Sequence, residues 1–207
     1  MSVKHFVNKL QKASEYECPE DVILYGLDGI ISGAISLLLL GIASVWMCKL
    51  KELFVFLFIH VGVGRYIGGF HAKTRVRCQV ITVVSFLAVS LLSDWFLKNV
   101  NKWLASVFAL ACIVFVCVET PVENANKRLT ADEIKEAKKN TIFYMCIIAE
   151  VLIGAVTVCT SPWLVHVLLL NLIDVSFFII LGRRGVGFGK KAYSDSNCET
   201  CRVDCEK

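Results

Sequence analysis

Long apolar stretches alternate with short polar ones along this chain. Several of the apolar stretches approach or exceed the roughly 18 to 20 residues that an α-helix needs to cross a bilayer. The pattern therefore predicts an all-α, polytopic integral membrane protein with about six transmembrane or re-entrant helices. The six segments lie near Val22–Cys48, Leu53–Gly64, Gln79–Leu97, Trp103–Val118, Thr141–Thr160 and Trp163–Leu181.

The second segment is short for a membrane span. It runs into Gly62, Gly64, Gly68 and Gly69. Glycines permit irregular backbone where it is buried in protein, so we expect a partial, kinked or re-entrant helix here.

Composition agrees with a membrane location. Of the 207 residues, 56% are hydrophobic and 19% are charged, whereas a soluble domain has about a quarter of its residues charged. We expect one membrane domain over residues 1–207, located in the cell membrane. Its parts are an N-terminal amphipathic segment (1–21), the transmembrane helices (22–182) and a basic, cysteine-containing cytoplasmic tail (183–207).

The N-terminus has no apolar core of the signal-peptide type. Val3, Phe6, Val7 and Leu10 recur at helical spacing among lysines. This spacing favours a short helix on the membrane surface, and an ordinary solvated start to the chain is the alternative.

The basic residues indicate the orientation, because cytoplasmic loops carry the excess of Lys and Arg. Most of the 22 basic residues fall in the N-terminal segment, residues 65–77, residues 119–140 and the C-terminal tail. Six spans place these four regions on one side, and a four-span variant with two re-entrant segments keeps the same sidedness. We therefore expect both termini and residues 65–77 to be cytoplasmic. The opposite side receives Lys49, Lys51, Lys98 and Lys102.

The ten cysteines do not predict disulfides, since several lie on the reducing side and others lie in apolar segments. The tail sequence CETCRVDC (198–205) offers only three thiols, and a structural metal site needs four ligands. We expect no metal, no cofactor and no nucleic-acid partner.

The stretch GGFHAKTRVRC (68–78) holds a histidine and a cysteine in a basic loop. A cysteine attacks carbonyl groups as the thiolate, and its free pKa of about 8.5 leaves little thiolate at neutral pH. Positive charge from Lys73, Arg75 and Arg77 favours the anion, and His71 can accept the proton. Cys78 is therefore the best nucleophile candidate among the cysteines.

The spacing of the two residues sets a constraint. On a straight helix, seven residues separate the Cα atoms of His71 and Cys78 by about 10.5 Å, whereas a working pair needs heavy atoms within about 3.2 Å. We expect the segment to bend, or a helix to begin near Lys73 or Thr74. The alternative is a loop that binds anionic lipid through its basic residues, with an incidental His and Cys.

The run RYIGGFHAKTRVRC (65–78) resembles the most specific motif of the accessory gene regulator protein B family. These are bacterial membrane cysteine endopeptidases that mature quorum-sensing peptides. A second matching element is PVENANKRL (121–129), although the family often has Pro where Arg128 stands. The resemblance covers nearly the whole chain, and the tail after Lys191 is covered least.

The resemblance implies that His71 is the general base and Cys78 the nucleophile, with support from Arg65 and Gly69. The substrate would be a propeptide with an amphipathic helix and an acidic C-terminal tail. Removing that tail would leave the upstream fragment as a thioester on Cys78. An internal cysteine or serine of the fragment would then close a thiolactone or lactone ring.

Other parts of such a site are less constrained by the residues. The charges of Lys73, Arg75, Arg77, Lys127 and Arg128 suit an acidic tail and equally suit anionic lipid. Backbone N–H groups near Cys78, or the Gln79 side chain, are candidates for an oxyanion hole. A homodimer is a hypothesis, because a small membrane protein must keep water away from the bound peptide.

Ionisable residues also occur in the apolar segments: Asp28, His60, Glu150, His166 and Asp174. An acid here either orients His71 or contacts the peptide, or it pairs within the bundle or meets water near the end of a span, and we favour this last, structural interpretation. Glu119 and Glu123 compete for the orienting role. We interpret the two histidines as packing residues. The alternative function is a small ion-coupled transporter that uses the intramembrane Asp and Glu residues.

Overall fold

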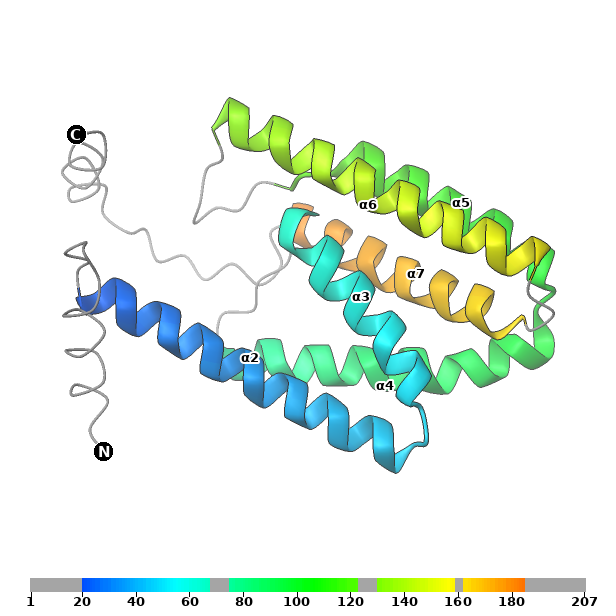
Figure 1. Ribbon diagram of the computed structural model, residues 1–207, viewed down its shortest axis with the longest axis horizontal. Helices are drawn as coiled ribbons and strands as arrows, with labels where there is room; N and C mark the ends of the chain where they lie inside the picture. Colours follow the sequence, from blue (N-terminus) through cyan, green and yellow to red (C-terminus); the bar gives the residue numbers. More distant parts are fainter. Residues whose placement is uncertain (1–19, 68–74, 123–129, 159–161, 185–207) are drawn as a thin grey trace.

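The computed structural model describes residues 20–67, 75–122, 130–158 and 162–184, and every regular element in these ranges is a helix (Figure 1). The helices are α2 (Glu20–Trp46), α3 (Leu50–Ile67), α4 (Arg75–Asn99), α5 (Lys102–Glu119), α6 (Ala131–Thr157) and α7 (Trp163–Arg183). All except α3 are long and apolar enough to cross a membrane. The prediction of an all-α polytopic membrane protein is confirmed. The predicted surface helix (residues 3–10) and the cysteines of the tail lie outside the described residues.

Each of the six predicted apolar segments corresponds to one helix, but α6 begins ten residues earlier than predicted. Its first turns, Ala131–Asn140, are polar and charged, so hydropathy does not reveal them. The start of α6 is fixed by a capping box: the Thr130 hydroxyl accepts from the Glu133 N–H, and the Glu133 carboxylate accepts from the Thr130 N–H. Such a box satisfies donors that a helix N-terminus otherwise leaves free.

The second segment forms one uninterrupted helix, and whether it is a partial or re-entrant span stays a prediction. α3 passes through Gly62 and Gly64 without interruption. The Tyr144 ring of α6 packs against Gly62, where a β-carbon would lie 3.1 Å from the ring. The small residue therefore lets α3 and α6 approach closely.

Successive helices run in opposite directions along the bundle (Figure 1). The C-terminal ends of α3, α5 and α7 and the N-terminal ends of α4 and α6 consequently lie together, at what we name the Cys78 end. The turn between α2 and α3 and the start of α7 lie at the opposite end. The basic regions 65–77 and 119–140 both begin at the Cys78 end, and the side of the membrane that this end faces stays a prediction.

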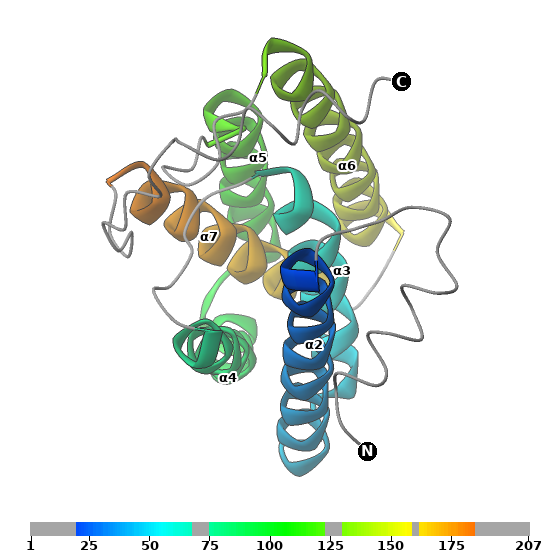
Figure 2. The ribbon, with the colours of Figure 1, turned by 90° about the vertical axis from the view of Figure 1, so that its left-hand side faces the viewer.

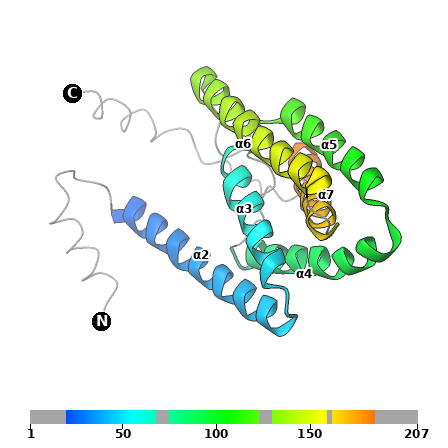
Figure 3. The same ribbon diagram turned by 45° about the vertical axis from the view of Figure 1, so that its right-hand side comes forward.

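The core lies where α7 packs among α3, α4, α5 and α6. Residues 165–172 of α7 are all buried. α2 packs against α3 and α4 through Leu40 and Ser44, and its N-terminal part diverges from the other helices (Figure 3). Many large apolar side chains point outward on every helix, as a lipid-facing surface requires.

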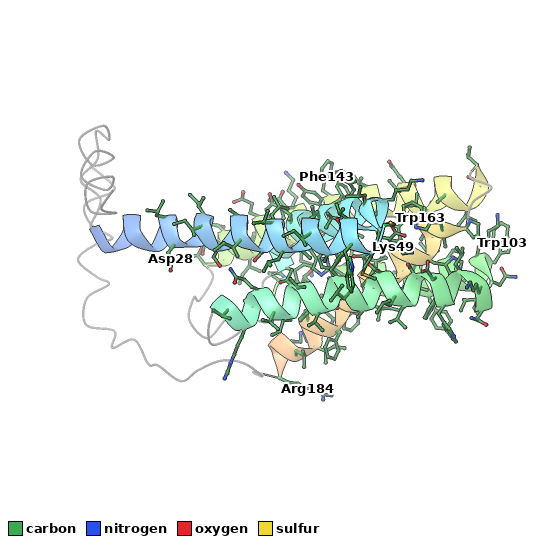
Figure 4. All side chains as sticks on the ribbon, turned by 90° about the horizontal axis from the view of Figure 1, so that it is seen from below. Asp28, Lys49, Trp103, Phe143, Trp163 and Arg184 are labelled. Atoms are coloured by element: carbon green, nitrogen blue, oxygen red, sulfur yellow. The ribbon has the colours of Figure 1, made fainter. Side chains whose placement is uncertain are left out.

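A polar network closes the opposite end of the bundle. The Lys49 ammonium pairs with Asp94 and, at 3.2 Å, with Glu52. The buried Glu52 carboxylate also accepts from the Trp163 indole N–H at 2.9 Å, and Figure 4 shows Lys49 close to Trp163. Burial lowers the pKa of Lys49, but the bonds to Asp94 and Glu52 outweigh burial and the pKa is raised.

His166 joins α7 to the turn between α4 and α5 at the same end. Its ring is buried, with Nδ1 2.7 Å from the Pro162 carbonyl oxygen and Nε2 2.9 Å from that of Val100. The interpretation of His166 as a satisfied packing residue agrees with these contacts.

Candidate active site

Cys78 lies at the start of α4, as the fourth residue of the helix. Its thiol is free and its side chain is exposed. The carbonyl oxygen of Cys78 accepts from the Thr82 hydroxyl at 2.9 Å, one turn further along α4. The structure thus gives the predicted nucleophile a helical backbone and an accessible sulfur.

The other predicted site residues are described only in part. Gly69, His71 and Lys73 fall in the range 68–74, which lies outside the described residues. Lys127 and Arg128 fall in the range 123–129, which also lies outside them. Arg65 lies in the last turn of α3 and Arg75 is the first residue of α4, and the structure gives no side-chain detail for either. Arg77 is exposed on α4. The structure therefore places Cys78 and Arg77, and the pairing of His71 with Cys78 stays a prediction.

Backbone and side-chain bonds connect the helix ends around Cys78. The Val122 N–H donates to the Ile67 carbonyl oxygen at 2.8 Å. The Arg183 guanidinium pairs with the Glu119 carboxylate and donates to the Glu119 carbonyl oxygen at 2.9 Å. Ile67 and Val122 are therefore neighbours, and Figure 2 looks onto this end of the bundle. Glu119, a candidate for orienting His71, is paired with Arg183, and its role towards His71 stays a prediction.

Gln79, the residue after Cys78, holds α4 against α2. Its side-chain amide donates to the Ser32 carbonyl oxygen at 3.0 Å and to the Ser32 hydroxyl at 2.9 Å. These bonds occupy the amide protons that we considered for an oxyanion hole. Sequence reasoning did not identify Ser32, because no spacing relates two residues that are 47 positions apart.

The three intramembrane acids have different surroundings. Asp28 and Glu150 are exposed on α2 and α6, and Figure 4 shows Asp28 towards the N-terminal end of α2. Asp174 of α7 is partly buried and contacts His60 of α3 and Ser85 of α4. The expected pairing within the bundle therefore applies to Asp174. His60, which we interpreted as a packing residue, is its partner.

Comparison with known proteins identifies the family. A family model described as accessory gene regulator B matches residues 3–182. The chain belongs to this family. Membership in the accessory gene regulator B (AgrB) family makes it a membrane protein related to quorum sensing, in a family linked to propeptide processing.

A curated relative of this AgrB-family chain is Protein FsrB of Enterococcus faecalis. It is 24% identical over 128 residues, which make up 60% of this chain and 51% of that protein. The chain thus spans about half the length of the curated relative that it matches. No solved structure matches the chain.

Proposed function

We propose that this AgrB-family protein is a membrane cysteine endopeptidase that cleaves the C-terminal tail of a quorum-sensing propeptide through a thioester on Cys78. The thioester then favours closure of a lactone or thiolactone ring. The observation that carries the proposal is the position of Cys78: an exposed, free thiol at the start of α4, directly after the segment that holds His71.

The chemistry needs one base and one nucleophile. His71 takes the thiol proton of Cys78, and the thiolate attacks the scissile carbonyl carbon. The C–N bond then breaks, the leaving amine of the tail takes the proton from His71, and the upstream fragment stays on sulfur as a thioester. No cofactor takes part in these steps.

Ring closure transfers the same acyl group a second time. An internal thiol or hydroxyl of the fragment attacks the thioester carbonyl, and the Cys78 sulfur leaves and regains a proton. Water at about 55 M competes, but a well-placed internal nucleophile reaches effective molarities of about 10⁵ M or more. Cyclisation therefore prevails if the fragment is held against the site.

The basic residues near Cys78 fit an acidic tail. Residues 65–77 contain Arg65, Lys73, Arg75 and Arg77 and no acidic residue. Lys127 and Arg128 of the second basic region add cations that would suit the same tail. Gly69 belongs to the same motif as His71 and would support the site by the resemblance to the family. This account requires the Cys78 end to face the cytoplasm, where the excess of basic residues belongs.

Co-expression with a tagged candidate propeptide tests the proposal. We expect Cys78→Ala and Cys78→Ser to lower cleavage by about 10³-fold or more, with membrane insertion unchanged. Cys48→Ser is the matched control, since Cys48 is also free and exposed but lies at the opposite end. Cleavage by either Cys78 variant at the parental rate would refute the assignment.

One observation favours the second candidate, a small ion-coupled transporter: the contact between His60 of α3 and Asp174 of the candidate span α7. Such pairs mark ion pathways in many transporters. Flux measurements in vesicles separate the two functions. A transporter would lose flux in Asp174→Asn and keep it in Cys78→Ala.

A further inference from the structure

Three helices meet at one carboxylate within the membrane-spanning part of the bundle. Asp174 of α7 lies 2.8 Å from the Nε2 atom of His60 on α3, through its Oδ2 atom. Its Oδ1 atom accepts from the Ser85 hydroxyl of α4 at 3.2 Å. We name these three residues the Asp174 cluster. The side chains of His60 and Asp174 are largely buried, with exposed fractions of 19% and 15%.

His60 is held by contacts on several sides. Its Nδ1 lies 3.2 Å from the Phe56 carbonyl oxygen, one turn earlier on α3, and its Nε2 faces the Asp174 carboxylate. The Phe56 ring stacks on the imidazole with centroids 3.9 Å apart. The Ser85 hydroxyl donates to the same carboxylate, so the polar atoms of the cluster bond to one another inside the bundle.

The cluster lies about as far from the end of α3 as from Cys78. His60 is seven residues before Ile67, where α3 ends, and Ser85 is seven residues after Cys78 on α4. Seven helical residues rise about 10.5 Å and complete nearly two turns. Ser85 and Cys78 therefore share one face of α4, and the cluster lies about two turns inside the bundle from both Ile67 and Cys78.

α7 and α2 both connect α3 with α4. Each of the two helices packs extensively against α7 and also against α2, whereas their contact with each other is small, and Figure 2 shows α7 next to α4. A shift of α3 relative to α4 along the bundle would change the distance between Ile67 and Arg75. Because Cys78 lies in the first turn of α4, the same shift would move the nucleophile relative to the end of α3.

From this geometry we infer that Asp174 is a positioning residue for the Cys78 site, because it binds His60 and Ser85 and thereby fixes the relative placement of α3 and α4. The inference rests on the proposed function. Asp174 itself touches neither substrate nor Cys78 in this account. A substitution far from the reacting atoms that misplaces them by about 1 Å can lower an enzymatic rate by about 100-fold.

Cleavage kinetics of purified protein in lipid vesicles test the inference. We expect Asp174→Ala to lower kcat per folded molecule by about 100-fold while KM changes less than about threefold. Asp174→Asn keeps one acceptor oxygen and should lose less, by roughly tenfold. The exchanged pair His60→Asp with Asp174→His should recover most of the loss. Glu150→Gln is the matched control, since this acid lies on the exposed side of α6, and it should retain parental kinetics.

A structural readout separates this inference from the proposed function. Nitroxide labels on p-acetylphenylalanine at Val61 and Val76, which are exposed on α3 and α4, report the distance between the helices without any substrate. We expect Asp174→Ala to shift or broaden that distance distribution and Glu150→Gln to leave it unchanged. An unchanged distribution in Asp174→Ala, or parental kcat in its folded fraction, would overturn the inference even if Cys78 cleaves the propeptide. If the parent protein cleaves nothing, the proposed function fails, while the distance measurement still decides whether Asp174 places α3 and α4.

Discussion

The two ends of the helix bundle use their polar residues in different ways. At the opposite end, Lys49, Glu52, Asp94 and Trp163 bond to one another. At the Cys78 end, residues 65–77 carry basic side chains without an acidic residue among them, beside an exposed thiol. The comparison teaches that the first set of charges bonds within the fold, whereas the second supplies the cations that the proposed acidic tail of the propeptide requires.

Two histidines make the comparison testable. His166 is buried at the opposite end, with carbonyl oxygens at both ring nitrogens. His71 precedes Cys78 by seven residues at the other end. Substituting each should separate a loss of chemistry from a loss of stability.

The largest effect is expected for His71→Gln. Removing a general base lowers a rate by about 10²- to 10⁴-fold, so propeptide cleavage should fall by this factor while the Tm stays within about 1 °C of the parent. Cleavage and thermal unfolding are measured on the same purified sample. A cleavage rate within a factor of about two of the parent would show that His71 is not the base.

His166→Gln should do the reverse. It leaves the Val100 and Pro162 carbonyl oxygens without their present partner, which costs about 1–3 kcal/mol in the free energy of unfolding. The cleavage rate per folded molecule should not change, because His166 lies at the opposite end. Unfolding in denaturant and kinetics corrected for the folded fraction measure the two quantities. A specific loss of rate here would break the distinction between the ends.

Lys49 gives the opposite end a pH dependence. Its pKa is raised in the folded protein above the ordinary value of 10.5. Protonated Lys49 therefore stabilises the fold fully below pH 10.5, and this contribution is lost as pH rises through the higher folded pKa. Lys49→Met should remove a contribution of about 1–2 kcal/mol at neutral pH and flatten the alkaline part of the stability profile. Equal alkaline slopes in parent and variant would argue against the ion pairs.

Arg183→Gln should have the smallest effect. The Arg183 side chain is 52% exposed, and exposed ion pairs contribute about 1 kcal/mol or less. We expect a Tm decrease of a few degrees at most, similar cleavage, and no effect from Arg184→Gln as the neighbouring control. A loss of cleavage in Arg183→Gln would mean that the Glu119 contact positions the site.

Much of the fold follows from the sequence, because apolar length alone reveals five long spans and one shorter helix. The start of α6 is missed by hydropathy, although the Thr130 and Glu133 spacing of a capping box could have revealed it. α3 was expected to be interrupted at its glycines, but Gly62 serves close packing against Tyr144.

Less of the site follows from the sequence. The Cys78 nucleophile could be singled out because charge and a nearby histidine are local features. The contact between His60 and Asp174 joins residues 114 positions apart, and no periodicity predicts which of several intramembrane polar residues pair. Such contacts are set by how the helices pack, which depends on many side chains at once.

The most direct measurement of the central claim is the mass of the protein after brief incubation with its propeptide. The account predicts an adduct equal to the upstream fragment, located on the peptide that contains Cys78, released by hydroxylamine and absent in Cys78→Ala. Cleavage that proceeds without such an adduct, or an adduct that persists in Cys78→Ala, would contradict the account.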